Sequence, residues 1–405
     1  MSNQSKPEKI ALPFITLMAV LMSLTALSID VMLPALSQMG EDLEVHNPND
    51  VQLIISSLFI GLAIGVMFFG PFSDSFGRKK AIYLGISIFL CGCAASIFSI
   101  NFEFMLIGRV LQGFGAASCR IAAMCMIRDR FEGNAMARVM SFILIIFILI
   151  PALAPSLGQM ILLFANWRVI FIVMFLIGIV SVTWVAFGQE ETLKPEKRLP
   201  FKIKPIVNAI IETITNKVSR GYIIASGLIF GAFVGYLNSS QQILQEQYEL
   251  GEAFAIVFGF LALAIGIASY ANSRWVYKYG MEKICHTSLL VMVGITTIFL
   301  PISLLLNGHP PLILLIIYLL VVFFCCGLLF ANFSTMAIHP LGHIAGAANS
   351  VIGAIQILLS VVLGGTIGYF YNGTINPLII GFFILGIWSF LLVAGLTKTS
   401  RIKHV

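Results

Sequence analysis

Long apolar segments alternate with short polar ones along almost the whole chain. Each apolar segment is about 20 residues long, the length that an α-helix needs to cross the hydrocarbon core of a bilayer. The pattern therefore predicts an all-α integral membrane protein with twelve transmembrane helices. The expected spans are 11–36, 51–70, 80–100, 103–127, 139–163, 168–188, 219–243, 253–273, 284–306, 311–335, 346–370 and 376–396.

The longest polar interruption divides these spans into two sets of six. We expect an amino-terminal six-helix bundle over residues 1–188, a cytoplasmic loop over 189–218 and a carboxy-terminal six-helix bundle over 219–405. Two pseudo-symmetric bundles around a central site are an architecture of secondary transporters.

A faint internal repeat supports this division. Residues 70–80, between the second and third spans, have a counterpart in residues 272–283 after the eighth span, where Gly280 takes the place of Gly77. The counterpart has no acid in the place of Asp74, so the two loops are not expected to work identically.

Composition and charge place the chain in a membrane. Hydrophobic residues make up 59% of the 405 and charged residues 10%, and the mean hydropathy of +0.99 exceeds that of soluble domains. The net charge of +6 could suggest a nucleic-acid partner, but most cations lie in loops on one predicted side, which the positive-inside rule assigns to the cytoplasm. We expect a multi-pass inner-membrane protein, surrounded by lipid and without a nucleic-acid partner, whose termini are both cytoplasmic, as the cations near them indicate: Lys6, Lys9, Lys398, Arg401 and Lys403.

Metal, redox and catalytic sites find little support. The seven cysteines lie in or beside apolar segments, as small buried residues do. His339 and His343 have the spacing of a helical metal pair, but Pro340 and Gly342 favour a loop there and no third ligand is evident. Neither a His-Glu-x-x-His motif nor a phosphate-binding glycine loop occurs. We expect no metal, no cofactor and no enzymatic activity, with energy drawn from an ion gradient or from the gradient of the substrate.

Several motifs resemble those of the major facilitator superfamily, in its twelve-span drug:proton antiporter branch and the bicyclomycin and chloramphenicol resistance (Bcr/CflA) subfamily. The resemblance implies proton-coupled drug export by rocking of the two bundles, and we expect the chain to work as a monomer. It is carried by the loop residues Gly70, Asp74, Gly77, Arg78 and Lys79, by Arg109, Gln112 and Gly115 in the fourth span, by residues 151–158 in the fifth, and by Asp30, Pro34 and Glu191 to Leu193.

Asp30 and Arg109 are the candidates for proton coupling. They lie at similar depths in the first and fourth spans, about 9 Å from the outer end at 1.5 Å per residue. A carboxylate in a low-dielectric site is either paired with a cation or protonated. We expect Asp30 to bind the proton and Arg109 to pair with it in one conformation; a static structural ion pair is the alternative.

Arg120 adds a second cation to the fourth span. It follows Arg109 by eleven residues, which places both on one helix face about 16 Å apart. Two cations with only one clear acid nearby predict a positive central site, where Arg109, Arg120 and Gln112 would bind a carboxylate or phosphate group. Alternatively, Arg120 extends toward the cytoplasmic surface or meets an acid elsewhere.

The seventh span carries the densest uncharged polar stretch among the spans. Buried amides need hydrogen-bond partners, so we expect Tyr236, Asn238, Gln241 and Gln242 to line water or substrate. The alternative is the ordinary polarity of a helix end.

Gating residues are expected at two places. The resemblance implies that the loop residues Asp74, Gly77 and Arg78 lock the two bundles together in one state; the alternative is a charge cluster that only fixes topology. Pro151 and Pro155 interrupt the backbone hydrogen bonds of the fifth span and could bend it.

The sequence thus predicts a proton-coupled exporter that works by alternating access. Its substrate is expected to be drug-like or a polar or anionic metabolite, such as a siderophore-like polycarboxylate. Two alternatives remain open: a gradient-driven uptake permease for a small anionic solute, and a membrane sensor that does not transport.

Overall fold

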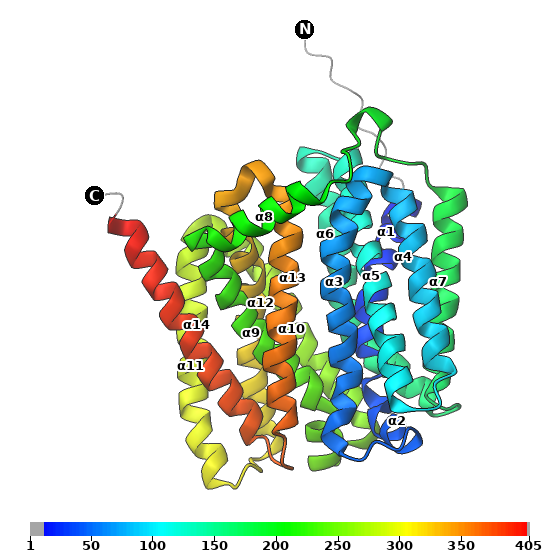
Figure 1. Cartoon of the computed structure of the whole chain (residues 1–405). Coiled ribbons are helices and arrows are strands. Elements are labelled where there is room, and N and C mark those ends of the chain that lie inside the picture. Colours follow the sequence, from blue (N-terminus) through cyan, green and yellow to red (C-terminus); the bar gives the residue numbers. More distant parts are fainter. Residues whose placement is uncertain (1–11, 403–405) are drawn as a thin grey trace.

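The computed structural model describes residues 12–402, apart from some side chains within 133–148 and those of 203 and 397–402. It is a bundle of long helices (Figure 1), and no β-strand occurs within the described range. The side chains on which the expectation for the two termini rested, Lys6, Lys9, Lys398, Arg401 and Lys403, lie outside the described residues.

Twelve long helices form the bundle, as predicted. Within residues 12–402, ten segments are long and apolar enough to cross a membrane. One of these segments, Leu312–Tyr369, contains two of the long helices. The remaining long helix is apolar over the shorter stretch Leu149–Leu162. The helices are α1 (Leu12–Asp30), α3 (Leu53–Phe76), α4 (Arg78–Ile97), α5 (Phe102–Arg130), α6 (Gly133–Leu162), α7 (Arg168–Gly188), α9 (Lys217–Gln241), α10 (Phe254–Tyr279), α11 (Met281–Leu305), α12 (Leu312–Ile338), α13 (Ala345–Tyr369) and α14 (Asn376–Ile402).

Short helices connect the long ones. At one end of the bundle they are η1 (Leu33–Ala35), α2 (Leu36–Asp42), η2 (Pro48–Gln52), the π-helix η4 (Gln242–Gln247) and η5 (Gly251–Ala253). At the other end they are η3 (Pro195–Lys197), α8 (Ile203–Thr215) and η6 (His339–Ile344).

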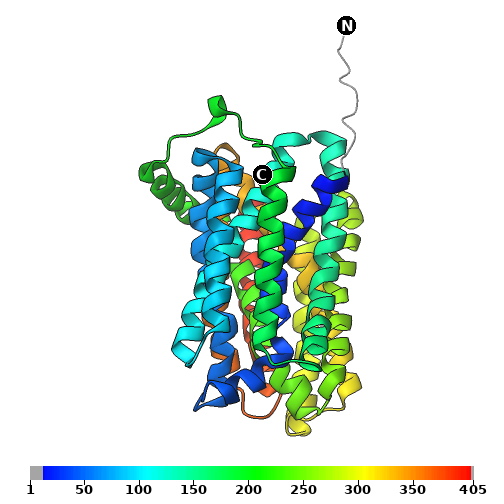
Figure 2. The same cartoon turned by 90° about the vertical axis from the view of Figure 1, so that its right-hand side faces the viewer.

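Helix α8 was not predicted, because residues 189–218 were interpreted as a loop. Its apolar residues recur at spacings of three and four, the period of an amphipathic helix. It lies across one end of the carboxy-terminal bundle and contacts α9 and α13. Figure 2 shows the linker that contains it crossing the same end of the molecule.

The two ends of the bundle differ in charge. We call the end that carries the linker the basic end; it is uppermost in Figure 1 and contains Arg78, Lys79, Lys80, Lys194 and Lys197. We call the opposite end, where α2 lies, the acidic end; it contains Glu41, Asp42, Glu44, Asp50 and Glu103.

Two seams join the helices of the chain's first half to those of its second. Helix α3 packs against α13, and α6 packs against α10. Glycines allow this close approach: a Cβ atom on Gly259 of α10 would lie 2.4 Å from the carbonyl oxygen of Ala152 on α6, and one on Gly70 of α3 would lie 2.4 Å from Ser350 Oγ on α13. Helices α1 and α3 to α7 otherwise pack mainly among themselves, as do α9 to α14.

Candidate functional site

Hydrogen bonds between amide groups close the acidic end. The Nδ2 atom of Asn49 donates to the carbonyl oxygens of Tyr369, at 2.9 Å, and Tyr371, at 2.8 Å. The Nε2 atom of Gln242 donates to Asn49 Oδ1 at 3.1 Å, and Asn238 Nδ2 donates to Ser56 Oγ at 3.3 Å. We call Asn49, Ser56, Asn238 and Gln242 the amide clasp, since each makes a hydrogen bond between the two bundles.

Local structure positions Asn49. The side chain of Asn47 accepts a hydrogen bond from the Asn49 backbone N–H at 3.1 Å, and Pro48 occupies the first position of η2. Asparagine at a helix N-cap with proline after it is a strong start signal, because the cap satisfies a free N–H group and proline has none to satisfy. Asn49 is thereby held on a rigid turn between α2 and α3.

Tyr371 supports the clasp from the carboxy-terminal bundle. Its hydroxyl donates to the carbonyl oxygen of Gln242 at 3.1 Å. Burial, together with the nearby Glu246 carboxylate and Tyr248, raises the pKa of Tyr371 to about 12. The phenol therefore stays protonated at neutral pH and remains a donor.

Burial along α9 shows where the molecule is closed. Every residue from Val234 to Leu244 is buried, toward the acidic end, whereas Leu228, Phe230 and Phe233, toward the basic end, are partly exposed. The expected pocket residues Tyr236, Asn238, Gln241 and Gln242 all lie in the buried part. In this conformation they belong to the closed seam and do not line an accessible pocket. The amides of Asn238 and Gln242 bond to the opposite bundle, and that of Gln241 bonds to Glu246 at 3.0 Å.

An aromatic cluster lies along the same helix. Phe230 meets Phe59 of the opposite bundle at a centroid distance of 6.1 Å and Phe330 of α12 at 5.5 Å. Phe233 also packs on Phe330, at 5.8 Å, and Tyr236 packs on Phe323, at 4.7 Å. Phe230, Phe233 and Phe330 are half-buried, so this cluster borders the accessible part of the bundle.

Arg120 lies near the middle of α5. Its side chain is exposed to solvent. Arg109, eleven residues earlier, is fully buried. The two cations therefore have different surroundings, although their spacing places them on one helix face.

Arg109 ties four helices of the amino-terminal bundle together. Its Nε atom donates to the carbonyl oxygen of Ile54 at 3.1 Å and its Nη2 atom to that of Ser28 at 2.7 Å. Its Nη1 atom donates to Gln112 Oε1, and its guanidinium lies 5.7 Å from the Phe171 ring. Since neither Arg109 nor Gln112 is exposed, neither lines an accessible site in this conformation.

The expected ion pair between Asp30 and Arg109 is not formed. Among the described side chains, Asp30 has neither a hydrogen bond nor an ion pair to Arg109, whose guanidinium is taken up by carbonyl and amide oxygens. Asp30 is buried at the end of α1 and lies close enough to Tyr236 of α9 to interact with it electrostatically. Within the described residues, the buried Tyr236 hydroxyl and Asn238 Oδ1 have no hydrogen-bond partner.

A charged network lies at the basic end. Arg78 Nε donates to Asp129 Oδ2 at 3.0 Å, and Arg78 Nη1 donates to Asp74 Oδ1 at 2.5 Å and to Ser73 Oγ at 3.1 Å. The Thr192 hydroxyl also donates to Asp129, at 2.9 Å. This network joins α3, α4 and α5 within one bundle and extends to the linker.

Glu191 caps α4 next to this network. Its carboxylate accepts hydrogen bonds from the backbone N–H groups of Arg78, at 3.0 Å, and Lys79, at 3.1 Å. A carboxylate is favoured there by the partial positive charge of a helix N-terminus. Gly77 makes the approach possible, because its φ is +109° and a Cβ atom there would lie 2.5 Å from Glu191 Oε2.

Pro151 and Pro155 both lie within α6, which remains a single helix. The segment lies at the seam between the bundles, since Ala152 approaches Gly259 of α10. Gly158, one turn further along, approaches the end of α1 so closely that a Cβ atom would lie 1.8 Å from the Val31 carbonyl oxygen.

The histidine pair lies in a short connecting helix. His339 and His343 lie in η6, and His343 Nε2 lies 2.7 Å from Glu212 Oε1 of α8. No group of three or more metal-ligating side chains occurs among the described residues.

Sequence reasoning missed Asn49, Tyr371 and the aromatic cluster. The sequence Asn47-Pro48-Asn49 carries a turn signal that could have indicated a fixed polar side chain before the second span. No comparable signal distinguishes Phe230 or Phe233 from the other residues among 33 phenylalanines.

Comparisons with known proteins agree with this architecture. The chain matches the family model described as Major Facilitator Superfamily over residues 18–368. It is 30% identical over 402 residues to the MFS-type transporter YdgK of Bacillus subtilis (strain 168), covering 98% of each chain. It is 28% identical over 384 residues to the bicyclomycin resistance protein homolog of Haemophilus influenzae, covering 93% of each. It is 27% identical over 335 residues to the multidrug resistance protein MdtL of Escherichia coli, covering 81% of each.

Solved structures share the fold. The human organic anion transporter MFSD10 (TETRAN) superposes with a TM-score of 0.72 at 15% identity, covering 95% of this chain and 100% of that one. The xylose transporter XylE from E. coli superposes with a TM-score of 0.71 at 14% identity, covering 95% and 98%. With a family model that matches most of its length and a relative at 30% identity over nearly all of it, this chain belongs to the Major Facilitator Superfamily and is a transporter, not an enzyme.

Proposed function

We propose that this chain exports a small organic molecule that carries an anionic group, in exchange for protons. Family membership makes it a multi-pass secondary transporter, and relatives named for drug resistance favour export of drug-like compounds. The observation that carries the anion preference is the exposure of Arg120 near the middle of the membrane-spanning helix α5. A guanidinium at membrane depth is costly unless it faces water, an anion or both.

The orientation follows from the charge of the two ends. With the basic end in the cytoplasm, as the positive-inside rule requires, the protein lies in the inner membrane with both termini cytoplasmic. The amide clasp then closes the outer side, and the accessible position of Arg120 corresponds to an inward-facing state. A substrate would reach Arg120 from the cytoplasm.

The aromatic cluster supports a substrate with an apolar body. Phe230, Phe233 and Phe330 are half-buried and offer ring faces next to the accessible region. Stacking on aromatic rings stabilises flat apolar groups, and a single guanidinium satisfies one carboxylate or phosphate in a bidentate manner. An amphipathic organic anion fits both features.

Asp30 is the residue that we propose for proton coupling. It is a buried carboxyl group without a cationic partner among the described residues, at the junction of α1 with α9. Desolvation favours the protonated acid at such a site. Tyr236 interacts electrostatically with Asp30 from the other bundle, so a change of charge on Asp30 would act directly on the closed seam.

Alternating access requires the clasp to open. Its contacts are hydrogen bonds between neutral groups, each worth about 1 kcal/mol net, because water replaces the lost partners when the seam opens. Such a closure can open and reform during each transport cycle.

The test is transport into proteoliposomes by purified protein. The probes are a fluorescent aromatic carboxylate, a polycarboxylate, a neutral antibiotic and a cationic dye of similar size, with a pH gradient imposed. We expect the aromatic anion to accumulate on the acidic side, and Arg120→Ala to reduce that accumulation about tenfold relative to the neutral compound. Arg128→Ala, which removes an exposed cation near the basic end of the same helix, is the matched control.

Three outcomes would contradict this proposal. Accumulation away from the acidic side would show uptake. No turnover of any probe would favour a sensor. An unchanged preference between anion and cation in Arg120→Ala would remove the anion selectivity.

A further inference from the structure

The end of α1 carries an acid whose neighbours have unused hydrogen-bonding groups. The Asp30 carboxyl is 5% exposed and makes neither a hydrogen bond nor an ion pair among the described side chains. The Tyr236 hydroxyl and Gln159 Oε1 are buried and likewise lack a partner within the described residues. We call Asp30, Gln159 and Tyr236 the α1 cluster. Buried polar groups are almost always hydrogen-bonded, so three such groups without partners in one region point to bonds that form in another state of the acid.

Helix packing places Gln159 beside Asp30. Gly158 lies against the backbone of Val31, since a Cβ atom on Gly158 would be 1.8 Å from the Val31 carbonyl oxygen. Gln159 is the next residue in α6, and Asp30 immediately precedes Val31, so both belong to this contact between α1 and α6. At about 100° per residue, Gln159 points within about 20° of Ala152, which packs against α10 across the seam. Gln159 therefore faces the seam and not the bilayer.

Tyr236 approaches the same acid from the carboxy-terminal bundle. Its hydroxyl lies close enough to Asp30 for an electrostatic interaction but has no hydrogen bond to it. Its ring packs on Phe258 of α10 at 5.8 Å and on Phe323 of α12 at 4.7 Å. The ring is thus held within its own bundle, and its hydroxyl is directed toward α1.

The two neighbours suit different protonation states of the acid. An amide oxygen only accepts hydrogen bonds, so Gln159 Oε1 can bond to a protonated carboxyl but not to a carboxylate. A phenol O–H donates, and hydrogen bonds to an ionised acceptor are stronger than those to a neutral one. The Tyr236 hydroxyl is therefore the better partner for the ionised acid.

We propose that Asp30 exchanges hydrogen-bond partners when it exchanges its proton: the protonated acid donates to Gln159 Oε1, and the carboxylate accepts from the Tyr236 hydroxyl. The inference rests on the proton coupling proposed above for Asp30, and it makes Gln159 and Tyr236 positioning residues. The first bond stays within the amino-terminal bundle, whereas the second crosses the seam. Loss of the proton therefore adds a bond that holds the acidic end closed. This bond keeps the empty, deprotonated carrier from opening, which an exchanger must do to prevent a proton leak.

Other charges near the cluster are already engaged. Arg109 of α5 bonds to backbone carbonyl oxygens, and Arg168 of α7 bonds to Asp42. The facing parts of α6, residues 149–162, and of α10, residues 254–269, contain no titratable side chain. On the helices that pack around the end of α1, the groups left to respond to the charge of Asp30 are thus those of the α1 cluster.

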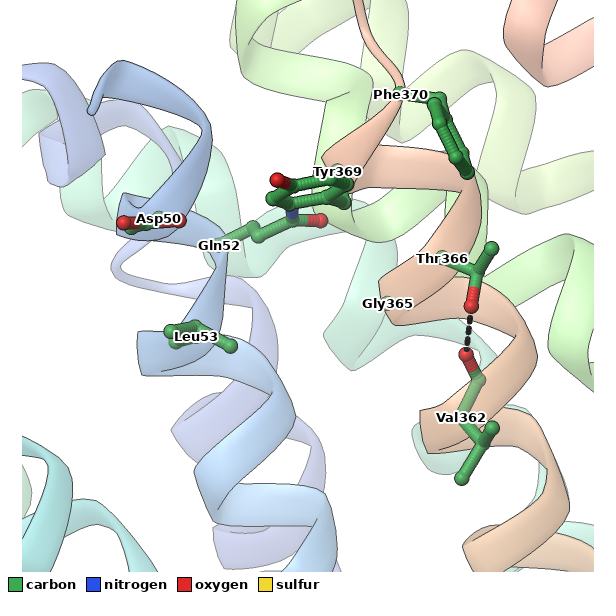
Figure 3. Close-up of a pocket in the computed structure, with 8 residues that line it drawn as sticks. All are labelled: Asp50, Gln52, Leu53, Val362, Gly365, Thr366, Tyr369 and Phe370. Atoms are coloured by element: carbon green, nitrogen blue, oxygen red, sulfur yellow. Dashed lines mark hydrogen bonds between the residues drawn. The ribbon is translucent and has the colours of Figure 1, made fainter.

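Asp50 is a contrasting acid at the same end of the molecule. It is partly exposed and lines a cavity of about 450 Å³ between α3 and α13 (Figure 3). Water can hydrate its carboxyl there, so Asp50 needs no protein partner in either protonation state. It therefore serves as the control acid.

Infrared difference spectroscopy of the full chain in nanodiscs tests the exchange of partners without any transport. The carbonyl band of protonated Asp30 is the band that Asp30→Asn removes and Asp50→Asn leaves, and its pH titration gives a midpoint. We expect Gln159→Met to lower this midpoint by about one pH unit, because the protonated acid loses its acceptor. We expect Tyr236→Phe to raise it by about one pH unit, because the carboxylate loses its donor.

Opposite shifts distinguish partners of the acid from residues that only support the fold. Gln356→Met removes another half-buried amide from a membrane-spanning helix, and Tyr318→Phe removes another buried phenol; both should leave the midpoint unchanged. Shifts of the same sign in Gln159→Met and Tyr236→Phe, or no shift in either, would overturn the proposal. If the midpoints shift as expected but Asp30→Asn still transports as wild type does, the proposed coupling fails and the exchange of partners stands.

Discussion

The two ends of the molecule are held by different chemistry. At the acidic end, neutral amide side chains make hydrogen bonds between the bundles, whereas at the basic end Arg78 pairs with Asp74 and Asp129 within one bundle. An ion pair that loses one member leaves an uncompensated charge, but a separated amide pair only exchanges its partner for water. In the proposed transport cycle, the contacts that break are thus those that cost little free energy to separate, and the charged contacts stay within a unit that can move as a whole.

The largest effect is expected for Arg78→Ala. Arg78 is 6% exposed and holds two carboxylates, so its removal leaves Asp74 and Asp129 close together without a cation. We expect a loss of about 3 kcal/mol of stability, measured by chemical denaturation in detergent. Lys80→Ala, at an exposed position two residues away, is the control and should change stability little. Equal stability of the two variants would contradict the contrast between the ends.

Asn49→Ala should have the next largest effect, on conformation. It removes three hydrogen bonds of the clasp, and we expect a shift of about 2 kcal/mol toward the state that is open at the acidic end. The readout is labelling of a cysteine introduced at the buried Ser239 by a membrane-impermeant maleimide, in a background without the exposed Cys91. Labelling no faster than in Asn372→Ala, an exposed loop control, would contradict the assignment of the clasp.

Tyr371→Phe should have a smaller effect on closure, because Tyr371 acts only by supporting Gln242 of the clasp from within the carboxy-terminal bundle. It removes a single hydrogen bond to the Gln242 carbonyl oxygen, worth about 1 kcal/mol. Because the pKa of Tyr371 is raised to about 12, its contribution is complete below the ordinary tyrosine pKa of about 10 and is lost only as the pH rises through the higher value. The difference in labelling between Tyr371→Phe and wild type should therefore stay constant between pH 6 and pH 9, a range that lies about one unit or more below the ordinary tyrosine pKa. A difference between Tyr371→Phe and wild type that changed within this range would count against the account.

Glu212→Gln should have the smallest effect. Glu212 meets His343 on the surface at 2.7 Å, a pair that is charged only when the histidine is protonated. Exposed pairs contribute about 0.5 kcal/mol, so we expect thermal unfolding to change by no more than a degree or two. A loss comparable to that of Arg78→Ala would mean that the linker holds the molecule together more than its contacts indicate.

The fold could be predicted from the sequence because a bilayer imposes a length of about 20 apolar residues on each spanning helix. That single constraint predicted the twelve long helices. Helix α8 was missed because an amphipathic helix at a surface has no such length signature.

The candidate site was less predictable, because partners far apart in the sequence decide it. Equal depth predicted that Asp30 pairs with Arg109 in one conformation; the pair is not formed in this one, and depth does not fix the direction of a side chain around a helix. Carbonyl oxygens of Ser28 and Ile54 instead satisfy Arg109, and no sequence pattern identifies a backbone carbonyl as a partner. The polar residues of the seventh span were expected to bind substrate, and the structure places them in a seam whose other half is Asn49.

The central claim is that Asp30 couples proton movement to export. The most direct measurement is accumulation of the fluorescent aromatic carboxylate in proteoliposomes with an acidic lumen, comparing wild type with Asp30→Asn. We predict accumulation above the external concentration for wild type, and equilibration without accumulation for the variant, because the amide cannot exchange a proton. Accumulation by Asp30→Asn equal to that of wild type would contradict the account.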